Sequence, residues 1–365
     1  MAFQNIIQHL RARFGKYERL YDEEHIELES PPHKRCVPKR FGFPRFRKLT
    51  VYLILINLII LGLLIHSIRP LITLLIRNNE LFAINFSVDH AAQPDAFQRP
   101  DGKKIPRILH QTAPNSSIPE IWAASQQSCQ KAYSDFEYKL WTDEGAREFL
   151  KEEFPWYLDT WDNYPFPIQR ADAIRYFVLY HFGGIYMDMD TYCNSSFPVD
   201  QIESLPGKEH ALFKSTLPTG ITNDFLIATA RHPAFASAVS RLASFHQTTR
   251  LWARLQPYAA IMLSTGPLFL TLAVQQYLLG QPILPSPNIN IIDPAMVDYY
   301  MTDFETATWH QSDAQVLKWL GDRPWTWFSL GIIGVTAGIY TFNCVLSRTF
   351  TTFYPIAFFK KKIRF

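Results

Sequence analysis

Two aspartates, Asp188 and Asp190, directly follow a short apolar strand expected over residues 185–187. Residues two apart on an extended backbone point to the same side, so both carboxylates can face one ion. Two hard oxygen ligands with open coordination positions suit Mn²⁺ or Mg²⁺ bridging to a diphosphate better than a closed structural site. The same pair could also be two solvated carboxylates at a turn, and the surrounding residues must decide.

The segment before this pair predicts a helix over residues 168–182 that ends at Gly183 and Gly184. Asp172 and Arg175 are three residues apart and therefore share one face of that helix. They could form an ordinary surface ion pair, which would contribute little to stability. The glycines and the following strand nevertheless bring this helix and the aspartate pair into one local unit.

Strands and helices alternate through the middle of the chain, which is typical of an α/β sheet with both faces covered. Ligands of such sheets bind at the carboxyl ends of the strands. His110, Trp141 and the Asp188/Asp190 pair all fall at expected strand ends. Strands are expected over residues 105–110, 136–141 and 185–187, and helices over 119–133, from 143 onward and over 168–182.

Two apolar runs lie outside this region, at residues 49–65 and 325–346, and neither contains a charged residue. Residues 34–48 before the first run hold seven basic residues and no acidic one. A second basic group, residues 348–364, follows the second run. Buried core helices would be the alternative, but basic flanks are typical of membrane spans with cytosolic ends. Nucleic acid is not expected as a partner, because the basic groups flank apolar runs.

Both termini are therefore expected in the cytosol, with the region between the spans in a lumen. Three glycosylation sequons, at Asn85, Asn115 and Asn194, agree with a lumenal position without proving it. Cys129 and Cys193 would both be lumenal and could form a bridge, but the sequence does not establish that they meet.

These features divide the chain into six segments. They are a cytosolic basic segment (1–48), a transmembrane helix with an interfacial extension (49–76), a linker (77–102), a lumenal catalytic domain (103–324), a second transmembrane helix (325–346) and a cytosolic basic tail (347–365).

Several motifs resemble glycosyltransferase family 32 and occur in the order found in that family. The segment 170–190, with the sequence RADAIRYFVLYHFGGIYMDMD, resembles the central motif of the family. Residues 105–112 (IPRILHQT) resemble its first strand, and residues 140–143 (LWTD) its second. Residues 265–267 (TGP) resemble a later helix start, and residues 309–314 (WHQSDA) the closing motif.

This resemblance implies a GT-A fold that uses a sugar nucleotide and a divalent metal in the lumen. An apolar run just after the closing motif makes the chain most similar to the fungal inositol phosphorylceramide mannosyltransferases. The implied donor is GDP-mannose, the implied acceptor is the inositol of inositol phosphorylceramide, and the implied location is the Golgi or the ER–Golgi membranes. A regulatory membrane subunit usually accompanies such a catalytic chain.

The resemblance also assigns roles to residues. The catalytic set is Asp172, Asp188, Asp190 and His310, of which Asp188, Asp190 and His310 would hold the metal. The donor site would comprise His110, Gln111, Thr112, Trp141, Arg170, Asp172, Arg175, Tyr186 and Asp313. Trp141 could pack on the base or only in the core, Tyr186 is favoured as structural, and Asp313 could orient His310 or cap a helix.

The implied chemistry is hexosyl transfer with retention of configuration. A front-face displacement is favoured, although a covalent intermediate on Asp172 is conceivable. Two alternatives remain: a family 32 transferase acting on protein-linked glycans, and a non-catalytic membrane subunit that keeps the fold. The four intact residues of the catalytic set argue against the second alternative.

Overall fold

The computed structural model describes residues 48–90, 104–217, 219–304, 315, 319 and 323–362 of the 365-residue chain. A six-stranded sheet with the strand order β2-β1-β3-β6-β5-β7 forms its centre. Strands β1, β2 and β3 are parallel to one another, as are β5 and β7, whereas β6 runs antiparallel to its neighbours β3 and β5. The six strands are β1 (Ile108–Ala113), β2 (Glu137–Thr142), β3 (Gly184–Met187), β5 (Ala211–Ser215), β6 (Ile221–Ala228) and β7 (Ile289–Ile292).

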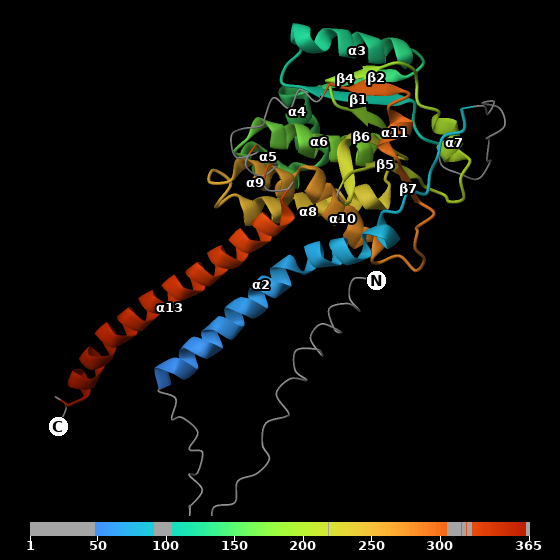
Figure 1. Ribbon diagram of the computed structural model, residues 1–365. Coiled ribbons are helices and arrows are strands. Elements are labelled where there is room, and N and C mark those ends of the chain that lie inside the picture. Colours follow the sequence, from blue (N-terminus) through green and yellow to red (C-terminus); the bar gives the residue numbers. More distant parts are fainter. Residues whose placement is uncertain are drawn as a thin grey trace, which may run out of the picture. The chain divides into compact units, whose positions relative to one another are not determined.

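Helices cover both faces of this sheet, and a separate hydrophobic cluster lies under each layer (Figure 1). The larger cluster is formed with α4 (Asp143–Glu153), α5 (Leu158–Asp162), α6 (Pro167–Phe182), α8 (Pro233–Thr249) and α10 (Pro267–Leu278). The smaller cluster includes residues of α3 (Glu120–Ala132), α7 (Val199–Glu203) and α11 (Pro294–Val297). The predicted α/β sheet with covered faces is confirmed.

The helix preceding the aspartate pair begins and ends as the sequence predicts. Pro167 occupies the first turn of α6, where a missing backbone N–H costs nothing, and Gly183 ends the helix with a φ of 71°. Thr142 caps α4 by accepting a hydrogen bond from the Gly145 N–H over 3.1 Å. These caps fix where β2 and β3 meet their neighbouring helices.

The first strand differs from the expected one. It begins at Ile108 rather than at residue 105, because the chain first turns at Pro106, whose carbonyl accepts from the Ile108 N–H over 2.8 Å. His110 therefore lies in the middle of β1 and not at its end. The carboxyl end of the strand is formed by Thr112 and Ala113.

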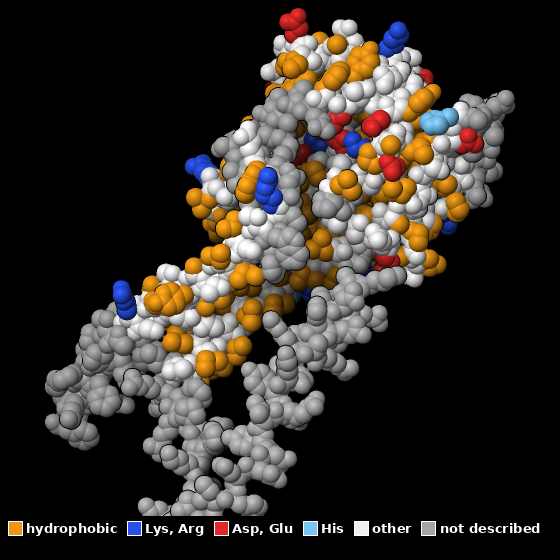
Figure 2. All heavy atoms as spheres, in the orientation of Figure 1, with side chains coloured by type: hydrophobic (Ala, Val, Ile, Leu, Met, Phe, Trp, Pro, Cys, Tyr) orange, Lys and Arg blue, Asp and Glu red, His pale blue; other side chains and the backbone are white. Residues whose placement is uncertain are grey.

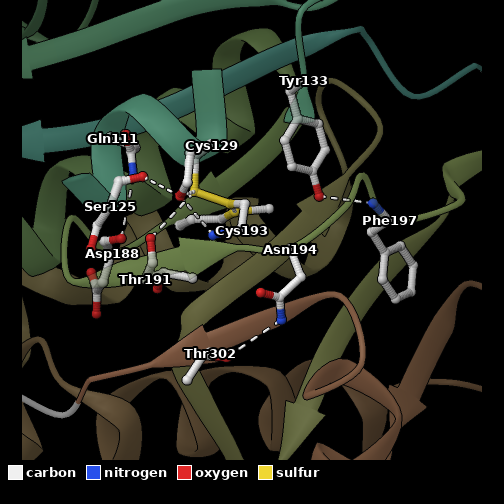
Figure 3. Close-up of a disulfide and its surroundings, with 12 residues drawn as sticks. Gln111, Ser125, Cys129, Tyr133, Asp188, Thr191, Cys193, Asn194, Phe197 and Thr302 are labelled. Carbon is white, nitrogen blue, oxygen red and sulfur yellow. Dashed lines mark hydrogen bonds between the residues drawn. A yellow bond between two sulfur atoms is a disulfide. The ribbon is translucent and has the colours of Figure 1, made fainter. Parts of the chain in front are cut away.

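A two-stranded sheet of β4 (Thr191–Cys193) and β8 (Met301–Asp303) follows the aspartate pair. A disulfide joins Cys193 of β4 to Cys129 of α3, so the bridge that the sequence left open is present (Figure 3). The Cys193 N–H also donates to Ser128 Oγ over 2.9 Å. Helix α3 is thereby attached to β4, which starts directly after Asp190.

Two long helices lie outside the sheet domain, α2 (Lys48–Leu81) and α13 (Pro324–Lys362). Within them, Thr50–Leu81 and Ser329–Thr349 are long and apolar enough to cross a membrane, and their most apolar windows are 0% buried. Figure 2 shows hydrophobic side chains along these helices. The amide of Asn57 in α2 donates to Asn343 Oδ1 of α13 over 3.0 Å, so the two helices share a polar contact.

A third helical stretch, Pro257–Leu278, also meets the length and hydropathy of a span, but 56% of its most apolar window is buried. It consists of two helices, α9 (Pro257–Ser264) and α10, which are separated at Thr265 and Gly266. Eight residues of α10 are buried, and Phe269 to Val274 lie in the larger cluster except for Thr271. This stretch is therefore part of the folded core.

The C-terminal half of α2 is packed against the domain. Leu74 and Leu81 belong to the larger core cluster, and the carbonyl of Pro70 accepts from Gln275 Nε2 of α10 over 3.1 Å. Residues 77–102 were expected to be a linker, yet Phe82 and Phe86 are buried within the described part, residues 77–90. The segment after the helix is held against β7, because the Asn85 and Phe86 N–H groups both donate to the Ile291 carbonyl over 3.1 Å.

Replacing Gly184 by alanine is expected to destabilise the fold by about 2 kcal/mol or more, because φ is 99° and the new Cβ would lie 2.5 Å from the Ile108 carbonyl oxygen. Thermal unfolding of the purified chain in detergent measures this. Gly145→Ala is the matched control, since its Cβ would meet only Thr142 Oγ1 at 3.4 Å. Equal melting temperatures for the two variants would contradict the close approach of β3 to β1.

Candidate functional site

A cavity of about 540 Å³ opens at the carboxyl ends of β1, β2 and β3. Its lining contains polar side chains, which we call the polar side, and apolar side chains, which we call the apolar wall. The polar lining includes Thr112, Asp143, Asp172, Arg175, Asp188, Asp190 and Asn223, and the apolar lining includes Trp122, Trp141, Trp161, Phe166, Ile261 and Pro267. The expected strand-end site therefore exists, and it brings both aspartates together with the Asp172/Arg175 pair.

Arg175 is the centre of the polar side, and its side chain is only 3% exposed. Its Nη2 lies 2.9 Å from Asp172 Oδ1 and 3.1 Å from Asp188 Oδ1. Its Nη1 donates to the Asn223 carbonyl over 2.5 Å, and the guanidinium lies over the Tyr186 ring at 4.6 Å. Burial opposes the charged form, but Asp188, Tyr186 and Asp172 outweigh it and raise the pKa of Arg175 above its ordinary value.

Asp172 is held from three sides. Besides Arg175, the Asn223 amide donates to Oδ1 over 3.0 Å and the Thr265 hydroxyl donates to Oδ2 over 3.1 Å. Burial raises the pKa of Asp172, while Arg175, Thr265 and Asn223 counteract the rise. Both oxygens are thus engaged, and the carboxylate is positioned to orient its neighbours rather than to attack a substrate.

Asp188 and Asp190 follow the carboxyl end of β3. The backbone N–H of Asp188 donates to the Asp224 carbonyl over 3.0 Å. The side chain of Asp188 is 31% exposed, and its Oδ1 accepts from the Tyr186 hydroxyl over 2.9 Å. Burial raises the pKa of Asp188 to about 7, against the lowering effect of Arg175, and Asp224 and Asp190 add to the rise. A cation at this position would favour the ionised form.

Beside this pair, on strands β5 and β6, Lys214 and Asp224 form an ion pair whose side chains are 14% and 20% exposed. Asp224 Oδ1 is buried and has no hydrogen-bond partner within the described part of the chain. Three residues of this region, Asn223, Asp224 and Lys214, were not among the expected site residues. Nothing in the sequence around Asn223 and Asp224 distinguishes their strand from any other strand, and only the pairing of β6 with β3 places the two residues beside the aspartate pair.

Of the three β1 residues expected in the donor site, one lines the cavity and two are buried in the core. Thr112 lines the cavity, and its hydroxyl contacts the Tyr186 hydroxyl at 3.0 Å. His110 and Gln111 are fully buried and do not line the cavity, which corrects the expected nucleotide-pocket position. Both residues precede Thr112 and lie away from the carboxyl end of β1. Neighbouring residues of a strand point to opposite faces, so each of the two side chains is covered on one face of the sheet.

His110 is a neutral core histidine. Its Nε2 lies 2.9 Å from the Gly183 carbonyl, and its Nδ1 accepts from Trp141 Nε1 over 3.0 Å. Burial lowers the pKa of His110 to about 4. Trp141 is oriented by this bond and also lines the cavity, so it lies at the border between the core and the cavity. Tyr186 is fully buried and contacts the site only through Asp188, Thr112 and Arg175.

Arg170 lies apart from the main cavity. Its Nη2 pairs with Asp143 Oδ2 at 2.8 Å, and it lines a neighbouring hollow that shares Asp143 and Trp161 with the main cavity. His310 and Asp313 lie outside the described residues. Among the residues that are described, no group of three or more His, Cys, Asp or Glu side chains is arranged to hold a metal ion.

Comparison with known proteins identifies the family. Residues 119–211, which include α6, β3 and both aspartates, match the model of the glycosyltransferase sugar-binding region containing the DXD motif. A mannosyl phosphorylinositol ceramide synthase of Saccharomyces cerevisiae is 37% identical over 313 residues, or 84% of this chain and 78% of the relative. The chain belongs to the DXD-containing glycosyltransferases. The resemblance seen in the motifs is confirmed.

A second relative of the glycosyltransferase matches over a shorter part of the chain. Inositol phosphoceramide mannosyltransferase 2 of Schizosaccharomyces pombe is 38% identical over 221 residues, covering 59% of this chain and 61% of the relative. Among solved structures, the PaToxG glycosyltransferase matches with 20% identity and a TM-score of 0.35, covering 50% of this chain and 72% of that one. A TM-score this low supports no comparison of the two sites.

Asn223→Ala is expected to cost about 1–3 kcal/mol, because it removes a buried donor shared by Asp172 and the Tyr176 hydroxyl. Chemical denaturation of the purified glycosyltransferase measures the cost. Asn163→Ala is the control, since Asn163 is exposed and bonds only to Asp159. A cost for Asn223→Ala no larger than that of the control would contradict the network.

A pH dependence of stability follows from Asp188. Its pKa is about 7 in the folded state against an ordinary 3.8, so between about pH 4 and pH 7 the folded state binds a proton that the unfolded chain has released. Stability contributed by this group therefore falls as pH rises through that window, and Asp188→Asn removes the fall. In metal-free buffer, the melting temperature of the variant relative to the native chain should rise from pH 4 to pH 8. A difference that does not change with pH would contradict the raised pKa.

Proposed function

We propose that this chain transfers mannose from GDP-mannose to the inositol headgroup of inositol phosphorylceramide, with retention of configuration, in a GT-A fold. The relatives named as mannosyl phosphorylinositol ceramide synthases and inositol phosphoceramide mannosyltransferases support this acceptor. The observation that carries the proposal is the cavity in which the Asp188/Asp190 pair meets the buried Arg175. This combination suits a donor with a diphosphate and a sugar.

The polar side of the cavity fits a divalent cation. Asp188 and Asp190 both line the cavity, and their hard oxygens are the ligands that Mn²⁺ or Mg²⁺ favour. His310 is proposed as a third ligand from the closing motif. When bound, such a cation would neutralise the charge that develops on the leaving diphosphate.

The described side chains would orient the donor. The planar guanidinium of Arg175 lies beside Asp188, and its ion pair with Asp172, also on α6, fixes its position. The apolar wall, which includes Trp141 and Trp161, excludes water from the sugar side. Because Asp172 has both oxygens engaged, we favour front-face displacement over a covalent intermediate on this carboxylate. Thr112 and Trp141 are proposed to contact the nucleotide directly, and His110, Gln111, Tyr186, Arg170 and Asp313 to support it.

We also propose that α2 and α13 anchor the enzyme in the Golgi or ER–Golgi membranes with both termini in the cytosol. The exposed apolar side chains of both helices and the basic residues flanking them support this topology. The catalytic domain would then face the lumen, where the Cys129–Cys193 disulfide is stable. A regulatory membrane subunit is proposed as the partner of the catalytic chain.

The decisive experiment measures transfer from labelled GDP-mannose to inositol phosphorylceramide in membranes that contain the full chain. We expect Mn²⁺-dependent transfer that falls about 100-fold or more in Asp190→Ala, because a ligand of the cation is lost. Asp135→Ala is the control, since Asp135 is an exposed carboxylate between α3 and β2. Transfer to a protein-linked glycan in place of the lipid would overturn the acceptor assignment. Loss of transfer in both variants would overturn the role of Asp190.

A further inference from the structure

A compact turn between α8 and α9, residues 250–256, presents two leucines to solvent. Leu251 is 86% exposed and Leu255 is 79% exposed. The turn itself is fixed, because Ala253 is 1% exposed and the Leu255 N–H donates to the Trp252 carbonyl over 2.9 Å. We refer to residues 250–256 as the dileucine turn. Its exposed leucines are held in place by the fold.

The segment that carries the dileucine turn contains basic residues but no acidic ones. Arg250 and Arg254, each directly before one of the leucines, are exposed. Between Asp224 and Asp293 the chain has no acidic residue and four arginines. This segment includes α8, α9 and α10. Exposed leucines between arginines, in a segment without acids, suit an anionic lipid surface, where leucine enters the apolar layer and arginine reaches the phosphates.

The helix layer that carries the turn also contacts the end of the first apolar helix. Gln275 of α10 donates to the carbonyl of Pro70 in α2, and Ser237 of α8 donates to the Ala273 carbonyl of α10 over 3.0 Å. The charge-free run of α2 ends at Ile65, five residues before Pro70, which is about 8 Å of helix. Helices α8, α9 and α10 form the layer next to this end of α2 (Figure 1).

Both ends of the dileucine turn lead to the apolar lining of the cavity. Before the turn, His246 near the end of α8 packs on Tyr164, with ring centroids 4.8 Å apart. Trp161 and Phe166, on either side of Tyr164 in sequence, line the cavity. After the turn, α9 contributes Ile261 to the same apolar lining. A surface that docks at the turn would therefore lie next to the cavity.

We propose that the dileucine turn inserts into the anionic surface of the bilayer that α2 spans and holds the cavity at that surface. Leu251 and Leu255 enter the apolar layer, and Arg250 and Arg254 contact lipid phosphates. This inference rests on the proposed action on a membrane lipid, and it names the surface from which that lipid reaches the site. A protein partner is the alternative that the experiment must separate.

The first test is a measurement of depth in the bilayer that needs no enzymatic activity. The full chain, with Cys36→Ser and Cys344→Ser, carries a bimane label on Leu255→Cys and is reconstituted into phosphatidylcholine vesicles that contain phosphatidylserine and a doxyl-labelled lipid quencher. The matched control carries the label on Ile121→Cys, which is 67% exposed on α3 in the other helix layer. We expect the label at position 255 to be quenched by the lipid and the label at 121 to be unaffected.

The second test compares two acceptors. Leu251→Gln combined with Leu255→Gln should lower transfer to a long-chain acceptor in these vesicles by about tenfold or more, because the loss of each leucine from the apolar layer corresponds to about tenfold. Transfer to a short-chain, soluble analogue of the acceptor should be unchanged, because neither leucine lines the cavity. Replacing Arg250 and Arg254 by glutamine should remove the dependence of transfer on phosphatidylserine. Ile121→Gln is the control for a lost exposed aliphatic side chain.

The outcomes are separable. Equal, weak quenching at positions 255 and 121 overturns the inference, even if mannose is transferred normally. Quenching at 255 in a chain that transfers no mannose supports the inference and counts against the proposed function. Quenching that appears only after a second protein is added assigns the turn to a protein partner and also overturns the inference.

Discussion

A single buried cation, the guanidinium of Arg175, joins the elements on which the site depends. It comes from α6, pairs with Asp172 one turn earlier and with Asp188 at the end of β3, and donates to a carbonyl of β6. An unpaired charge at 3% exposure would be very costly, so these partners must stay in place whenever the protein is folded. Folding stability and the geometry of the site are therefore coupled through one side chain.

The glycine pair makes that arrangement possible. Gly183 and Gly184 both have positive φ, and a Cβ at either position would lie 2.5 Å from backbone atoms of a neighbouring segment. The chain can therefore leave α6 and enter β3 with almost no connecting residues, close against β1. A longer connection would separate Arg175 from Asp188. On the other side, the Cys129–Cys193 disulfide attaches α3 to the backbone just beyond Asp190, so the aspartate pair is fixed from both directions (Figure 3).

Local signals in the sequence predicted the elements but not their partners. The glycine pair marked the end of α6, and the i,i+3 spacing put Asp172 and Arg175 on one face of the helix. Nothing local shows that this pair is buried, because its burial depends on Asn223 and Thr265, which are 51 and 93 residues from Asp172. For the same reason, His110 was expected in the cavity: the turn at Pro106 shifts the strand, and only the folded register shows the result. Apolar composition was also ambiguous, since α9 and α10 are as apolar as a span but are buried in the core.

The partial burial of the Asp188 carboxyl explains why the aspartate pair is suited to a cation. Removal of water raises the pKa of Asp188 to about 7, so the folded chain alone favours a partly protonated carboxyl at neutral pH. The same removal of water strengthens the attraction between a carboxylate and a cation, because the local dielectric constant is low. A divalent ion would therefore displace the proton and recover the energy lost by burying the carboxylate. Arg175 recovers only part of this energy, since its positive charge is shared between Asp172 and Asp188. A bound cation would supply the remaining positive charge.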